Sequence, residues 1–231
     1  MPLHCLVTGA NRGIGLAFVR RLLARGDRVV AACRHPGKAT ALNTLAGEYP
    51  GRLHVLPLDV ADAKSRAELV RELPLVGGRI DLLINNAGVL HSGERFGALS
   101  AAHLEDSFRT NSAGPLLLTE ALAPTLSDGG CVANVSSQLG SIANTTRFGT
   151  PSYNISKAAQ NMATVLLAHA LHDRAIKVVA LHPGWVQTDM GGAGAQITVE
   201  ESVSGLLQVI DGLSPADSGR FLDWRGETLP W

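Results

Sequence analysis

Short apolar runs alternate along this chain with longer segments whose apolar residues recur at helical spacing. The short runs are rich in β-branched residues, and several are apolar throughout, which is typical of strands covered on both faces. The connections between them are long enough for parallel crossovers. The pattern predicts about seven strands, at residues 3–8, 28–33, 53–58, 80–85, 131–136, 176–182 and 220–224.

The segments between these strands predict helices. Gly26 suits the C-cap of the first helix, Pro36 the first position of the second, and Ser100 the N-cap of a long helix. We expect Gly114-Pro115 to kink or divide that long helix, because proline lacks the N–H of a helical hydrogen bond. The expected helices cover residues 14–25, a segment from 36, 62–73, 100–126, 151–174 and 198–213.

Strands and helices alternate from end to end, with no linker, fixed-period repeat or low-complexity stretch. This order predicts the α/β class, as a single-domain Rossmann fold over residues 1–231 that serves as one dinucleotide-binding and catalytic domain. Its doubly wound parallel sheet of about seven strands should carry helices on both faces. Such a sheet binds its ligand outside the carboxyl ends of the strands, so the chemistry should lie in residues that follow strands.

Composition and charge exclude several classes of protein. Hydrophobic residues make up 45% and charged residues 17% of the 231 residues, and the formal net charge is zero. The balance is globular, and the lack of a Lys/Arg-rich run argues against nucleic-acid binding. No apolar run reaches the ~18 residues that span a bilayer, and the strand expected at Leu3 leaves no room for a signal peptide. We expect a cytoplasmic protein that binds neither nucleic acid nor membrane.

Cysteine and histidine spacing offers no metal site. Cys5, Cys33 and Cys131 lie in strand-like runs and form no CxxC pair, so we expect buried free thiols in a reducing cytosol. His169 and His172 could share a helix face, but no third ligand accompanies them. We therefore expect no metal.

A glycine-rich turn joins the first strand to the first helix and reads Thr8-Gly9-Ala10-Asn11-Arg12-Gly13-Ile14-Gly15. Gly9 permits a tight turn, while Gly13 and Gly15 let the backbone approach phosphates and the helix pack on the strand. The helix N-terminus behind the turn offers free N–H groups to an anion. The turn therefore predicts a dinucleotide site.

The spacing of this turn and a series of later motifs resemble the short-chain dehydrogenase/reductase family. The resemblance covers the whole chain. Within the family it is strongest to the carbonyl reductase, sniffer and C-factor branch, through residues 182–192 and the closing residues 224–231. The motifs that carry it are Thr8-Gly9…Gly13-Ile14-Gly15, Asp59-Val60, Asn85-Asn86-Ala87-Gly88, Asn111, Ser137, Tyr153…Lys157 and Pro183-Gly184.

The end of the second strand indicates which nicotinamide cofactor the chain prefers. An NAD site usually places an acid there, but no acid follows Arg34 before Glu48. Arg34 can pair with a 2′-phosphate, and Arg12 is placed to assist, so the sequence predicts NADP(H). By these residues and the resemblance together, the cofactor-binding residues are Gly9, Asn11, Arg12, Gly13, Ile14, Gly15, Arg34, Asp59, Val60, Asn86, Ala87, Gly88, Tyr153, Lys157, Pro183, Gly184, Val186 and Thr188.

Tyr153 and Lys157 lie four residues apart on a predicted helix, so they share one face. A tyrosine has a pKa of about 10, and a nearby ammonium would lower it. Such a pair alone is common on exposed helices, but the family resemblance implies that Tyr153 is the acid and base. It also implies that Lys157 tunes the tyrosine and binds the nicotinamide ribose. In the same family Ser137 would stabilise the substrate oxygen, and Asn111 would hold a water of a proton relay.

The resemblance implies an NADPH-dependent carbonyl reductase that transfers a hydride to a small-molecule aldehyde, ketone or quinone. An alternative from another class is an NAD(P)-binding signalling protein of the C-factor type. Sugar-nucleotide epimerisation is disfavoured, because the chain ends soon after the last strand with no added substrate domain.

Two loops are expected to border the substrate pocket, and two helices are expected to form a subunit interface. Residues 144–149 lengthen the interval between Ser137 and Tyr153 and should border the substrate. The short, Gly- and Ala-rich stretch 188–198 should form a flexible lid over an open, permissive pocket, with Trp185, Met190 and Phe148 as apolar walls. The Ala-rich helix at 151–174 and the helix through residues 116–118 commonly form a dimer face in this family, so we expect a homodimer.

Overall fold

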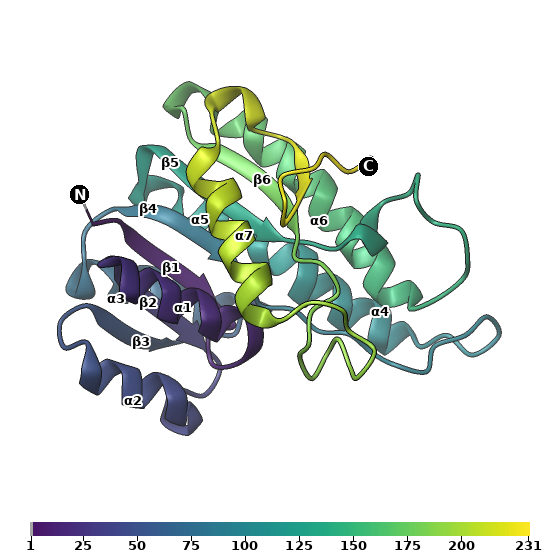
Figure 1. Cartoon of the computed structure of the whole chain (residues 1–231), viewed down its shortest axis with the longest axis horizontal. Helices are drawn as coiled ribbons and strands as arrows, with labels where there is room; N and C mark the ends of the chain where they lie inside the picture. The colour runs from purple at the N-terminus through teal and green to yellow at the C-terminus, as the bar shows by residue number, and fades with distance from the viewer. Residues whose placement is uncertain (1) are drawn as a thin grey trace.

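The computed structural model describes residues 2–231 and contains one seven-stranded parallel sheet (Figure 1). The strand order is β3-β2-β1-β4-β5-β6-β7, which is the doubly wound arrangement that the sequence predicts. The strands are β1 (His4–Thr8), β2 (Arg28–Cys33), β3 (Leu53–Pro57), β4 (Ile80–Asn85), β5 (Leu126–Val135), β6 (Lys177–His182) and β7 (Phe221–Asp223).

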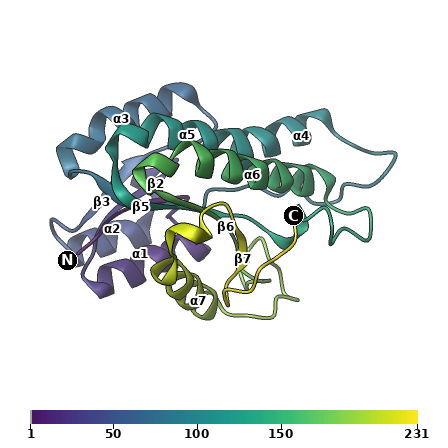
Figure 2. The same ribbon diagram turned by 90° about the horizontal axis from the view of Figure 1, so that it is seen from above.

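Helices cover both faces of the sheet (Figure 2). On one face Phe18, Leu42 and Val203 join a buried cluster with the strands, and on the other Leu69, Leu118 and Leu167 join a second cluster. Apolar residues on both faces of each strand therefore have a partner layer. The first layer holds α1 (Gly13–Arg25), α2 (Thr40–Glu48) and α7 (Val199–Gly212), and the second holds α3 (Ala63–Val76), α4 (Ala101–Phe108), α5 (Gly114–Leu122) and α6 (Pro151–Ala170).

The long helix predicted at residues 100–126 is divided. Ser100 caps it as expected, accepting a hydrogen bond from the His103 N–H, but α4 ends at Phe108. A π-helical turn (Arg109–Ala113) follows, and α5 begins at Gly114. Pro115 cannot supply an N–H to the preceding turn, so the helical hydrogen bonds rearrange just before it.

Other element boundaries differ from the expected ones by a few residues. β5 begins at Leu126 and not at residue 131, because Leu126 pairs with Ile80 and Cys131 with Leu82, with a register shift between them. The polar and glycine residues in that shift hide the start of the strand from the hydrophobic pattern. Pro36 opens a 3-10 turn (Pro36–Lys38) ahead of α2, and α6 ends at Ala170, before a second 3-10 turn.

The order of the strands positions a binding site. β1 lies between β2 and β4, so the chain winds outward from β1 to β3 and then returns to start β4 on the other side. The carboxyl ends of β1 and β4 therefore diverge into different helical layers and leave a crevice between them. This is where a doubly wound sheet binds its ligand.

The residues after β7 fold back over the edge of the sheet. Leu229 donates its N–H to the carbonyl of Phe221, and the Trp231 ring stacks on the Phe221 ring with centroids 5.4 Å apart. The Trp231 carbonyl accepts a hydrogen bond from the N–H of Ala143, at 2.9 Å. The closing segment thus links the sheet edge to the loop between β5 and α6.

Cys5, Cys33 and Cys131 are free and buried, as the sequence predicts. Burial raises the pKa of all three thiols, that of Cys131 to about 12. Across residues 2–231, no helix combines the length and the apolar character that a bilayer crossing requires.

Candidate active site

A cleft of about 800 Å³ opens at the carboxyl edge of the sheet. It runs from the glycine turn after β1, past the ends of β2 and β3, to the first turns of α6 and the segment after β6. Of the residues predicted at the cofactor, those that line it are Gly9, Asn11, Arg12, Gly13, Ile14, Arg34, Asp59, Val60, Asn86, Ala87, Gly88, Tyr153, Lys157, Pro183 and Thr188.

The glycine turn has the backbone conformation that its sequence predicts. Gly9 and Gly13 have φ angles of 62° and 53°, in the left-handed region that glycine tolerates best. The N-cap of α1 is Arg12, which makes no side-chain capping bond, and no acidic residue lies in the first turn. The N–H groups at the start of α1 therefore face the cleft without a carboxylate competing for them, which suits a phosphate.

Thr8 and Asn86 fasten this turn to the end of β4. The Thr8 hydroxyl accepts hydrogen bonds from the N–H groups of Asn86 and Ala87, both at 3.0 Å. The Asn86 amide in turn donates to the carbonyls of Thr8, at 3.0 Å, and Gly9, at 3.2 Å. The floor of the cleft is thus a rigid junction of two strand ends.

A basic group lines the cleft beyond the end of β2. Arg34 is exposed there, beside His35 and Lys38, neither of which was predicted. The described residues offer Arg34 no ion pair, whereas Arg12 pairs with Asp189 at 2.8 Å across the cleft mouth. Arg34 and Lys38 are therefore available to an anionic group, and Arg12 is already engaged.

Tyr153 and Lys157 meet at the other end of the cleft, on the buried face of α6. The Lys157 ammonium lies 5.7 Å from the centroid of the Tyr153 ring. Burial raises the pKa of Tyr153 to about 12, although the Ser137 hydroxyl acts in the opposite direction. Burial also lowers the pKa of Lys157 to about 7. We expected the ammonium to lower the tyrosine pKa, but loss of hydration dominates, and the opposing effect comes from the Ser137 hydroxyl.

Ser137 and Asn111 stand close to this pair. Ser137 follows β5, is 8% exposed, and its hydroxyl oxygen accepts a hydrogen bond from the N–H of Leu139. Asn111 is fully buried in the π-helical turn, where its side chain exchanges two hydrogen bonds with the backbone of Val89 and donates a third to Ser156 at 2.9 Å. The amide of Asn111 is thus held by protein groups on α6 and on the β4 end.

Three predicted cofactor residues do not line the cleft. A Cβ on Gly15 would lie 2.3 Å from the carbonyl oxygen of Gly9, so this glycine allows helix and turn to pack. Gly184 packs against Trp224, and Val186 is buried and bridges to Ile197. The residues that line the cleft but were not predicted include Cys33, His35, Lys38, Leu58, Ala61, Val89, Asp106, Thr110, Val135, Ser136, Gln187 and Asp189. Cys33, Leu58, Val135 and Ser136 lie at the ends of predicted strands, and most of the others lie in the segments that follow strands, which was the available signal.

The predicted lid at residues 188–198 contains no helix, and several hydrogen bonds hold it. The Trp185 indole donates to the carbonyl of Gly191 at 2.8 Å, and the backbone of Trp185 accepts from Gln196 and Ile197. Met190 lines the cleft, while Phe148 packs edge-on against Phe96 of the loop after β4, with centroids 5.7 Å apart.

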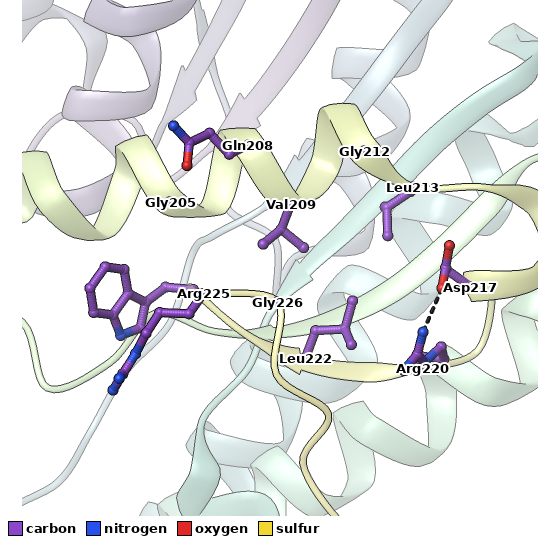
Figure 3. Close-up of a pocket in the computed structure, with 11 residues that line it drawn as sticks. Gly205, Gln208, Val209, Gly212, Leu213, Asp217, Arg220, Leu222, Arg225 and Gly226 are labelled. Carbon is purple, nitrogen blue, oxygen red and sulfur yellow. Dashed lines mark hydrogen bonds and ion pairs between the residues drawn. The ribbon is translucent and has the colours of Figure 1, made fainter.

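A second hollow, of about 310 Å³, lies between α7 and the segment around β7 (Figure 3). Its charged groups already have partners: Arg220 pairs with Asp217 at 2.6 Å, and Arg225 lies over the ring of Trp224. Neither Tyr153 nor Lys157 lines it. The chemistry-bearing residues therefore favour the cleft at the strand ends.

Comparison with known proteins agrees with this geometry. The model of the short chain dehydrogenase family matches residues 3–196. The chain belongs to the short-chain dehydrogenase/reductase family. C-signal of Myxococcus xanthus is 46% identical over 156 residues, which cover 67% of this chain and 94% of that protein.

Solved structures extend the likeness to the whole chain. The NADPH-bound carbonyl reductase from chicken fatty liver superposes with a TM-score of 0.94 at 39% identity, covering 100% of this chain and 99% of that one. The carbonyl reductase Sniffer of D. melanogaster superposes with a TM-score of 0.95 at 32% identity, covering 100% of each chain. The chain is an oxidoreductase of this family, and its similarity to the carbonyl reductase, Sniffer and C-factor branch is confirmed.

Proposed function

We propose that this chain is an NADPH-dependent carbonyl reductase, acting on a small-molecule aldehyde, ketone or quinone. The observation that carries the proposal is the placement of Tyr153 and Lys157 at one end of the cleft and Arg34 with Lys38 at the other. A dinucleotide laid along such a cleft would have its phosphates at the N-terminus of α1. The NADPH-bound chicken structure supports the same cofactor.

The residues present fit the cofactor. The left-handed glycines of the turn and the uncapped first turn of α1 suit a pyrophosphate. Arg34, which forms no ion pair within residues 2–231, suits a 2′-phosphate. Asp59 and Val60 would border the adenine, Asn86, Ala87 and Gly88 would lie under the dinucleotide, and Pro183 and Thr188 would flank the nicotinamide. When bound, NADPH supplies the hydride.

Tyr153 donates the proton that the substrate oxygen takes up. Its raised pKa keeps the phenol protonated at neutral pH, which is the state that a proton donor requires. Ser137 orients the carbonyl oxygen and donates a hydrogen bond to the charge that develops on it. Lys157 stabilises the phenolate left after proton transfer and binds the ribose, and Asn111 supports the relay that returns the proton.

The test is NADPH oxidation with a panel of aldehydes, ketones and quinones. Tyr153→Phe should abolish turnover while leaving NADPH binding intact. Tyr49 is the only other tyrosine, and its ring packs under Arg52 away from the cleft, so Tyr49→Phe is a matched control that should keep full activity. Substantial turnover in Tyr153→Phe would contradict the assignment of the proton donor.

The C-signal relative supports a second candidate, an NAD(P)-binding signalling protein. In that case the natural chain would bind NADPH but reduce no member of the panel. A signalling role would then be sought by comparing the cofactor-free and NADPH-bound protein for partner binding. Turnover that Tyr153→Phe abolishes favours the reductase.

We also infer a homodimer through α5 and α6, in a cytoplasmic protein. The alanines of α6 support a dimer less than the sequence suggested, because Ala163 and Ala168 are buried within the chain. Exposed Ile155, Met162 and Leu166 lie at one face of α6 and supply an apolar surface instead. Leu166→Glu should convert a dimer to a monomer in light scattering, and a natural protein that is monomeric would refute the inference.

A further inference from the structure

The Lys157 ammonium is buried among neutral groups. The residue is 3% exposed, and its Nζ donates to the carbonyl of Val135 at 2.7 Å and to the Oε1 of Gln160 at 2.8 Å. An ammonium has three protons to donate, so two are engaged by the protein and one is left for the cleft. The partner side chain, Gln160, has no role in the family resemblance or in the proposed mechanism.

Gln160 is an unusual residue for its position. It lies three residues after Lys157 on α6 and is 1% exposed. Its Nε2 is buried and makes no hydrogen bond within residues 2–231. A buried amide with one unpaired end costs free energy, which an apolar side chain of similar size would avoid. The contact that the amide does make is the one to Lys157, so stability does not explain the residue.

No charged side chain nearby serves as an alternative partner for the Lys157 ammonium. No carboxylate within residues 2–231 forms an ion pair with Lys157, and Tyr153 is the titratable group that faces it. Asp59 and Asp106 line the same cleft, but Asp59 accepts from the N–H of Ala61 and Asp106 pairs with His91. Gly140 of the loop after β5 packs closely on the base of Lys157 and brings no charged side chain there. Among residues 2–231, the Gln160 oxygen is therefore the one side-chain acceptor that hydrogen-bonds the ammonium.

We propose that Gln160 is a positioning residue, whose amide oxygen aims the Lys157 ammonium and keeps it protonated. The proposal rests on the proposed function for its catalytic consequence, but the contact itself does not. Burial places the pKa of Lys157 at about 7, so a neighbouring dipole decides how much of the lysine is charged at neutral pH.

Two substitutions should move that balance in opposite directions. Gln160→Met keeps the volume and removes the acceptor, so the pKa of Lys157 should fall. Gln160→Glu keeps the acceptor and adds a negative charge, so the pKa should rise by about one unit or more. A residue with only a packing role would not produce shifts of opposite sign.

The experiment is an NMR titration of the cofactor-free protein labelled with ¹³C at lysine Cε. The chain has only four lysines, Lys38, Lys64, Lys157 and Lys177, and Lys157→Met assigns the signal of interest. Thr164→Val is the matched control. It deletes a buried hydroxyl that donates to the backbone carbonyl of Gln160, and this hydroxyl makes no hydrogen bond to Lys157. The Lys157 pKa should fall in Gln160→Met, rise in Gln160→Glu and stay within a few tenths in Thr164→Val.

The proposal is overturned if the Lys157 pKa is the same in the natural protein and in either folded Gln160 variant. Should Gln160→Met fail to fold, Gln160→Glu alone decides it. In a reductase, the alkaline limb of kcat/KM should shift with the Lys157 pKa in each variant. Failure of the proposed function would instead appear as a natural protein without turnover, in which the NMR titration still tests the contact.

Discussion

The Glu94 carboxylate accepts two hydrogen bonds from Ser152, one from its N–H at 3.3 Å and one from its hydroxyl at 2.6 Å. Ser152 precedes Tyr153 in the first turn of α6. The N-cap of that helix, Thr150, has a φ of 40° and makes no side-chain capping bond. Glu94, whose side chain is 2% exposed, thus caps α6 from another loop, and a carboxylate is the favourable charge at a helix N-terminus.

Glu94→Ala should destabilise the protein by about 1–2 kcal/mol, because it removes the cap and leaves the Ser152 groups without their acceptor. Urea denaturation measures the change. Glu105→Ala, at an exposed position of α4, is the control and should lie within about 0.5 kcal/mol of the natural protein. Equal stability of the two variants would show that the cap contributes nothing.

Arg34→Asp should reverse the preference between NADPH and NADH. The substitution removes a cation that can pair with a 2′-phosphate and adds a repulsive charge, so NADPH affinity should fall by about tenfold or more. Arg12→Ala should have a smaller effect, because Arg12 already pairs with Asp189. Dissociation constants for both cofactors, measured by fluorescence, check the prediction. An unchanged ratio in Arg34→Asp would mean that other residues, such as Lys38, select the cofactor.

Gly15→Ala should weaken both folding and NADPH binding. The added Cβ would lie 2.3 Å from the Gly9 oxygen and 2.6 Å from Nδ2 of Asn86, so the turn must shift, at a cost of about 1–3 kcal/mol. Gly47→Ala is the control: nothing lies within 4 Å of its added Cβ, and alanine should stabilise α2 by about 0.5–1 kcal/mol. Calorimetry with and without NADPH separates the two effects, and tolerance of Gly15→Ala would disprove the close approach.

His182 should make stability depend on pH. Burial lowers its pKa to about 4, although Asp223 opposes the shift. In the unfolded chain the pKa of this histidine is about 6.5. Between pH 6.5 and 4 the unfolded chain therefore binds a proton at His182 that the folded chain does not bind, so stability is lost as the pH falls through this range. The loss should reach about 2–3 kcal/mol at pH 4.5.

His182→Asn removes this titration, so the stability difference between pH 7.5 and 4.5 should shrink by that amount. His4, whose pKa burial also lowers, should leave a slope of the same sign in both proteins. Urea denaturation at several pH values measures the difference. Parallel pH curves for His182→Asn and the natural protein would show that His182 does not titrate in this way.

Much of the fold could be predicted because local and global signals agree. The strand of Val29–Cys33 is apolar on both faces and lies buried between two layers. The glycines at 9 and 13 have the positive φ angles that the turn demands. Tyr153 and Lys157 share a helix face by spacing alone. In each case a few neighbouring residues decide the outcome.

The remaining features depend on contacts that no local pattern records. Glu94 and Ser152 are 58 residues apart, and nothing in either segment indicates that they meet. Gln160 looks like an ordinary helical residue until burial and the position of Lys157 are known. The rise in the Tyr153 pKa likewise comes from burial by many elements, whereas spacing suggested only the opposing effect of the ammonium.

The π-helical turn at Arg109–Ala113 fixes the number of residues that can connect α4 to α5. Relative to an uninterrupted α-helix it inserts one residue, which rotates everything after it by about 100° about the axis. The inserted residue therefore decides which side of α5 faces the sheet, and Leu118 and Leu122 lie on that buried apolar side. Deleting one residue here would rotate the apolar face of α5 away from the sheet and turn Asn111 away from Val89. A homologue with one residue fewer in this turn could therefore not keep both the buried face of α5 and the buried amide of Asn111.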